Sequence, residues 1–151
     1  MGAPKDFATK LQVGTGAAHI KSFIRHLENF EFEKTLGDHA PNQRLLYEPK
    51  GVCALITPWN WPMNQVCLKV IPALASGCTM VLKPSELAPL SSMVLTEIID
   101  ETKFPPGVFN LINGDGNITG DALTRHPDIN MISFTGSVSY THLRAHETSL
   151  H

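Results

Sequence analysis

The fold of this chain is decided by two stretches, Val52-Cys53-Ala54-Leu55-Ile56-Thr57-Pro58-Trp59-Asn60-Trp61-Pro62 and Thr79-Met80-Val81-Leu82-Lys83-Pro84-Ser85-Glu86. Each begins with a continuous apolar run of strand length, which is typical of a strand covered on both faces. In each stretch, polar residues next to a proline follow the apolar run. Ligands of open α/β sheets bind just past the carboxyl ends of the strands, so both polar segments are expected at one binding edge.

The surrounding chain alternates between helical and strand patterns. Apolar spacing predicts helices over 14–34, 63–76, 90–101 and 117–124, with a loop over 37–42. Short apolar runs predict further strands over 108–112 and 131–134. Strands that alternate with helices across short links form parallel sheets with right-handed crossovers. We therefore expect an α/β fold, a partial Rossmann-like parallel sheet with helices on both faces.

Composition limits the classes of function. The 151 residues carry a net charge of −2 and are 42% apolar, which suits a globular chain with a substantial core. We expect no nucleic-acid partner and no membrane association, because neither a basic surplus nor an apolar run of spanning length is present. Cys53, Cys67 and Cys78 stand in apolar settings and are expected to be buried, reduced thiols of a cytoplasmic protein.

Asn60 is the first candidate for chemistry. It stands between tryptophans and prolines directly after an apolar strand. A side-chain amide held in such a turn can donate a hydrogen bond to an oxygen that gains negative charge during a reaction. The alternative is a turn asparagine that caps the following helix. Trp59 and Trp61 are expected to shape and pack the loop.

Lys83, Ser85 and Glu86 form the second group. Lys83 ends an apolar strand, so its amine is expected at the rim of the sheet. Glu86 can accept two hydrogen bonds from ribose hydroxyls, and its charge would repel a 2′-phosphate, which favours NAD over NADP. The alternative is a helix start with Ser85 as the cap and Glu86 in the first turn, and both interpretations can hold together.

Two small-residue turns follow the later strands. Gly114, Gly116 and Gly120 form G-x-G-x-x-x-G, one residue longer than the common dinucleotide pattern, between a strand and a short helix. The alternative is an ordinary strand-to-helix turn. Phe134-Thr135-Gly136-Ser137 closes the last strand, where a small residue can present its backbone N–H and hydroxyl to a pyrophosphate.

These four motifs, in this order, resemble the aldehyde dehydrogenase superfamily over residues 1–137. The resemblance implies that Asn60 steadies the oxygen of a thiohemiacetal, that Lys83 and Glu86 contact the adenosine ribose of NAD, and that Ser137 contacts the pyrophosphate. The cofactor-binding residues expected on this basis are Ile56, Thr57, Pro58, Trp59, Lys83, Ser85, Glu86, Gly116, Gly120, Phe134, Gly136 and Ser137.

The resemblance also implies that part of the machinery is not in this chain. In the family the nucleophilic cysteine and the general-base glutamate follow the Phe-Thr-Gly-Ser region, so we expect this chain alone to be inactive. Residues 1–137 are expected to form a partial NAD-binding domain. Residues 138–151, with His142, His146 and His151, do not match the family and are expected to be a frayed or non-native tail. No metal site is expected.

Two functions remain open at this point. The parent enzyme implied by the resemblance oxidises an aldehyde to a carboxylic acid with NAD⁺, through a cysteine thiohemiacetal and thioester, and is a homo-oligomer. The alternative is a non-catalytic nucleotide-binding or interaction module that associates with a full-length paralogue.

Overall fold

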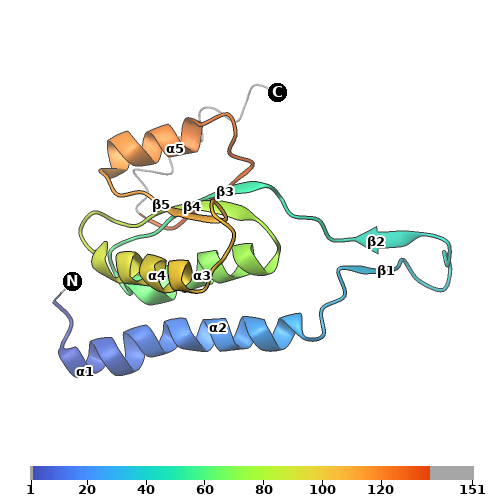
Figure 1. Ribbon diagram of the computed structural model, residues 1–151, viewed down its shortest axis with the longest axis horizontal. Helices are drawn as coiled ribbons and strands as arrows, with labels where there is room; N and C mark the ends of the chain where they lie inside the picture. Colours follow the sequence, from blue (N-terminus) through green and yellow to red (C-terminus); the bar gives the residue numbers. More distant parts are fainter. Residues whose placement is uncertain (1, 137–151) are drawn as a thin grey trace.

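A four-stranded parallel sheet forms the centre of the computed structural model, which describes residues 2–136 (Figure 1). Its order is β5-β4-β3-β6, and the strands are β3 (Val52–Ile56), β4 (Thr79–Lys83), β5 (Phe109–Leu111) and β6 (Met131–Phe134). Ile56 pairs with both Lys83 and Phe134, so β4, β3 and β6 end side by side. The predicted α/β class and parallel sheet are confirmed.

Helices cover both faces of this sheet (Figure 1). The α3 helix (Pro62–Ala75) and the α4 helix (Leu90–Glu101) pack on one face, while η2 (Gly116–Gly120) and α5 (Asp121–Arg125) lie over the other. Along β3, Cys53 and Leu55 join the core cluster under α3, whereas Ala54 and Ile56 pack with Leu123 of α5. Burial on both faces explains why this strand is a continuous apolar run.

The N-terminal helical segment forms a further layer against α3 (Figure 1). It runs through α1 (Lys5–Phe7), the π-helical η1 (Ala8–Val13) and α2 (Gly14–Leu27). Gly16 permits a close approach, because a Cβ there would lie 3.2 Å from Met63 and from the Cys67 Sγ. Among residues 2–136, no helix combines the length and apolar character needed to span a bilayer.

The predicted helix over 14–34 extends too far at its C-terminal end. The helix stops at Leu27, and β1 (Glu33–Thr35) pairs antiparallel with β2 (Arg44–Leu46) in a hairpin that projects from the sheet (Figure 1). The Phe30 ring lies 4.8 Å from Phe32 and 5.1 Å from Tyr47 between centroids. Phe30 and Phe32 alternate with glutamates, and this period of two overrides the helical pattern.

Candidate functional site

A groove of about 450 Å³ lies at the carboxyl ends of β3, β4 and β6. Residues 56–60 line it from the end of β3, Lys83, Ser85 and Glu86 from the end of β4, and residues 134–136 from the end of β6. Gly116, at the start of η2, also lines the groove. The groove thus brings together the polar segments that the sequence placed at one edge, as expected where parallel strands end in register.

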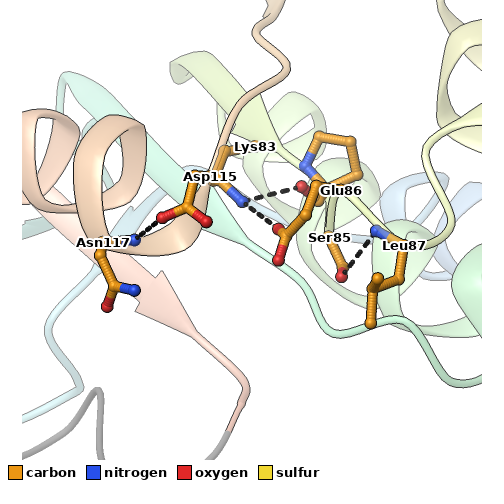
Figure 2. A network of polar contacts seen from close by, with 7 residues as sticks. Lys83, Ser85, Glu86, Leu87, Asp115 and Asn117 are labelled. Atoms are coloured by element: carbon orange, nitrogen blue, oxygen red, sulfur yellow. Dashed lines mark hydrogen bonds and ion pairs between the residues drawn. The ribbon is translucent and has the colours of Figure 1, made fainter.

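The Lys83 ammonium is buried at this edge of the sheet. Its side chain is 3% exposed, and its Nζ lies 3.2 Å from Oε2 of Glu86 while donating a 3.1 Å hydrogen bond to the Pro84 carbonyl (Figure 2). Removing a buried ammonium from water is costly unless charged and polar partners compensate. The Glu86 side chain remains 46% exposed, so the carboxylate pairs with Lys83 and still faces the groove.

Ser85 forms part of a turn and does not cap a helix. Its hydroxyl accepts a hydrogen bond from the Leu87 N–H at 3.3 Å (Figure 2). The helix begins only at Leu90, with Pro89 at its N-cap. The alternative interpretation of Lys-Pro-Ser-Glu as a helix start is therefore wrong, and the carboxylate of Glu86 is left outside the first helical turn.

Trp61 has an unusual backbone beside Asn60. It occupies the N-cap of α3 with φ 49° and ψ 56°, in the left-handed region, and makes no side-chain capping hydrogen bond. Asn60 is therefore not the cap of α3, contrary to the alternative interpretation. Asn60 is exposed and lines the groove together with Trp59.

Thr57 forms part of the groove wall and carries an unsatisfied group. The residue is 3% exposed, and its Oγ1 is buried with no hydrogen-bond partner among the described residues. A buried hydroxyl without a partner is uncommon in folded proteins.

The glycine-rich turn is shaped by Asp115. Its carboxylate accepts a 2.7 Å hydrogen bond from the Asn117 N–H and caps η2 (Figure 2). A Cβ on Gly114 would lie 1.9 Å from Oγ1 of Thr119, so only glycine fits there. Gly116 lines the groove, but Gly120 is buried at the end of η2 and is not among the lining residues.

The last motif is described only in part. Phe134 and Gly136 line the groove, and the Thr135 N–H donates a 3.1 Å hydrogen bond to the Ile56 carbonyl, which joins the ends of β6 and β3. Ser137 and the tail 138–151 lie outside the described residues. No group of three metal-ligating side chains occurs within residues 2–136.

Two lining residues were missed from the sequence, Gln65 and Thr135. Gln65 lies in the first turn of α3, where its N–H bonds to the Trp61 carbonyl at 3.0 Å. No signal in the sequence places Gln65 at the groove, because its position depends on how α3 leaves the Asn60 turn. Thr135 lies inside a motif already recognised.

The cysteines are remote from this chemistry. Cys53, Cys67 and Cys78 are buried and reduced, as predicted, and none of them belongs to the described lining of the groove. Burial raises the pKa of Cys67 to about 11. Burial and the neighbouring Cys78 thiol raise the pKa of Cys53 to about 11 as well.

The comparisons with known proteins agree with this architecture. The sequence pattern of the aldehyde dehydrogenase family matches residues 1–147, beyond the boundary expected at 137. A 3-succinoylsemialdehyde-pyridine dehydrogenase from a Pseudomonas species is 53% identical over 138 residues, which make up 91% of this chain and 28% of that protein. The chain therefore spans little more than a quarter of the length of this curated relative.

Two solved structures are similar over most of the chain. An aldehyde dehydrogenase from Bartonella henselae is 58% identical with a TM-score of 0.89, over 93% of this chain and 29% of its own. A mutant aldehyde dehydrogenase C from Pseudomonas syringae, solved with NAD⁺ and octanal, is 46% identical with a TM-score of 0.90, over 97% and 29% of the two chains. By sequence and by fold, this chain belongs to the aldehyde dehydrogenase family.

Proposed function

We propose that this chain supplies the cofactor-binding side of an enzyme that oxidises an aldehyde to a carboxylic acid with NAD⁺. The observation that carries the proposal is the groove at the ends of β3, β4 and β6, which is lined by Asn60 together with the Lys83–Glu86 pair. The similar Pseudomonas syringae structure, which contains NAD⁺ and octanal, supports the same pairing of cofactor and substrate class.

The groove fits the adenosine half of NAD⁺. Glu86 is paired with Lys83 through one oxygen and is half exposed, so it can accept hydrogen bonds from ribose hydroxyls. The same negative charge disfavours a 2′-phosphate, so NAD⁺ is preferred over NADP⁺. Gly116 and Gly136 line the groove and leave its walls without side chains at these two positions. When bound, NAD⁺ would supply the hydride acceptor of the reaction.

Asn60 would act on the aldehyde oxygen. Asn60 is an exposed residue of the groove lining and lies in the turn between β3 and α3. A positioned amide donor stabilises an oxygen as negative charge develops on it, and removal of one such donor typically costs about 10²–10³ in rate. The turn that carries Asn60 is already formed in the structure, so this role requires no rearrangement of β3 or α3.

The nucleophile of the reaction is not one of this chain's three cysteines. All three are buried outside the groove, and burial raises the pKa of both Cys53 and Cys67 to about 11, so these two stay protonated near neutral pH. Since a thiolate is the reactive form, we expect the chain by itself to bind NAD⁺ without oxidising aldehydes.

Calorimetric titration of the 151-residue chain with NAD⁺ and with NADP⁺ tests the proposal. We expect NAD⁺ to bind more tightly, and the Glu86→Gln change to weaken NAD⁺ binding by about tenfold through loss of charge-assisted hydrogen bonds. Gln keeps an oxygen that can accept from Lys83, which limits damage to the fold. Glu97→Gln, an exposed change on α4 outside the groove, is the matched control and should bind as the parent does.

Two results would overturn the proposal. One is absence of NAD⁺ binding by a chain that melts cooperatively, and the other is equal loss of binding in Glu86→Gln and Glu97→Gln. NADH formation on addition of aldehyde to the purified chain would contradict the part of the proposal that concerns the cysteines.

A further inference from the structure

Two features of the sequence disfavour the backbone conformation that Trp61 adopts. A residue with a Cβ rarely occupies the left-handed region, and Trp61 has φ 49° and ψ 56°. It also precedes Pro62, and a following proline normally pushes a residue toward extended conformations. Such strained residues persist only when the surrounding structure holds them, and they concentrate at functional sites.

The contacts that hold this turn come from the N-terminal helical segment, residues 5–27. The Phe7 ring packs edge-on against the Trp61 ring, with centroids 5.9 Å apart and planes at 79°. Farther along the same segment, the His19 Nε2 and the Asn64 Oδ1 are joined by a 2.8 Å hydrogen bond. Asn64 lies in the first turn of α3, three residues after Trp61.

Gly16 brings the two helices into register for these contacts. It lies on α2 between Phe7 and His19 and packs directly on the backbone of Met63, where a Cβ would lie 3.2 Å from the carbonyl oxygen. The strained turn is therefore held at its tryptophan ring and at two positions of the following helical turn.

Asn60 directly precedes Trp61, so the dihedral angles of Trp61 determine how the Asn60 turn joins α3. We propose that Phe7 and His19 are positioning residues, which hold Trp61 in its left-handed conformation and thereby set the direction in which the Asn60 amide enters the groove. The functional meaning of this arrangement rests on the proposed role of Asn60, but the arrangement itself can be measured without catalysis or cofactor.

The test follows the side-chain amide signal of Asn60 by NMR in the full chain with isotope-labelled asparagine, the signal being assigned through Asn60→Asp. We expect His19→Ala to shift or broaden this signal. His19→Gln should restore it, because a glutamine amide can also donate to the Asn64 oxygen. Phe7→Leu, which keeps an apolar side chain but removes the ring contact, should shift it as His19→Ala does.

Two internal controls separate positioning from general loosening. Asn110 bonds to the Met80 and Gly107 carbonyls at the end of the sheet remote from the groove, so its amide signal should stay in place. His26→Ala alters an exposed histidine of α2 whose ring bonds within its own helix, and it should leave the Asn60 signal unchanged.

A second variant removes the strain itself. Trp61→Gly can hold a positive φ without support, so adding His19→Ala to it should no longer move the Asn60 signal. The proposal is overturned if His19→Ala leaves the Asn60 signal in place, if His19→Gln fails to restore it, if the Asn110 signal moves equally, or if the effect of His19→Ala persists in Trp61→Gly. Failure of NAD⁺ to bind would instead refute the proposed function and would leave these signals interpretable.

Discussion

The ammonium of Lys69, on α3, donates a 2.7 Å hydrogen bond to the hydroxyl of Ser133, on β6. This contact joins α3 to β6, the edge strand that pairs with β3. Burial lowers the pKa of Lys69 below its usual 10.5, and a neutral hydroxyl compensates the buried charge less well than a carboxylate would.

This lowered pKa gives the protein an alkaline pH dependence of stability. Between the pKa of Lys69 in the folded state and 10.5 in the unfolded state, the unfolded chain binds more protons, so the Lys69 contribution to the free energy of unfolding rises with pH. We expect the difference between the parent and Lys69→Met to change in this direction across that window in denaturant titrations. Lys21→Met, an exposed lysine of α2, should show no such change.

Two glycines of the N-terminal helical segment should respond in opposite ways to alanine. A Cβ on Gly14 would meet no atom of the described residues within 4 Å, so Gly14→Ala should stabilise the helix by up to ~1 kcal/mol. Gly16→Ala gains the same propensity but places its Cβ 3.2 Å from Met63 and Cys67, so we expect net destabilisation. Thermal melting compares the two, and equal stabilisation would show that α2 can move away from α3 without cost.

Thr57 and Ser92, whose buried hydroxyls lack partners among the described residues, offer a second matched pair. Thr57→Val and Ser92→Ala each remove an unsatisfied group, and each should leave the free chain as stable or more stable, by up to ~1 kcal/mol. Thr57 lines the groove and Ser92 does not, but the hydroxyl oxygens of both are closed off from solvent, so neither change should alter NAD⁺ binding. Calorimetry and melting on both variants check this, and loss of NAD⁺ binding in Thr57→Val alone would show that the Thr57 hydroxyl reaches the ligand.

The three cysteines should differ in reactivity. Burial alone would raise the pKa of Cys78, but hydrogen bonds from Ser76, from the Lys50 and Gly51 backbone and from Cys53 outweigh it and lower that pKa. Because the thiolate is the nucleophile, we expect an alkylating reagent to modify Cys78 before Cys53 and Cys67 in the folded protein. Peptide mapping by mass spectrometry gives the order. Ser76→Ala should slow the Cys78 reaction, and an unchanged rate would contradict this account.

Much of the architecture could be predicted because its signals are local. The continuous apolar runs predict β3 and β4, and the observed bounds, Val52–Ile56 and Thr79–Lys83, agree closely with them. The α4 helix, Leu90–Glu101, agrees with its helical spacing. The polar residues after these strands could be assigned to one groove because parallel strands in register end at one edge.

The failures have equally physical causes. The β1–β2 hairpin was missed because Phe30 satisfies the helical spacing, whereas its ring packs on Tyr47, which is distant in sequence. Gln65 was missed because its place depends on how α3 leaves the Asn60 turn. Gly120 stays a predicted cofactor residue, but it is buried at the end of η2 and is not among the residues that line the groove.

The sequence by itself determined that this chain forms a parallel α/β sheet with its polar residues gathered at the strand ends, and it carried the motifs of the aldehyde dehydrogenase family. The hydrophobic period and the alternation of strands with helices along the chain suffice for that, because both are properties of neighbouring residues. The contacts across the chain come from the tertiary packing: the Phe7 ring on Trp61 and His19 on Asn64. They join separate elements, and no local pattern contains the distance at which those elements pack. The pair of Lys83 and Glu86 is local in sequence, but the burial of the Lys83 side chain depends on the same packing.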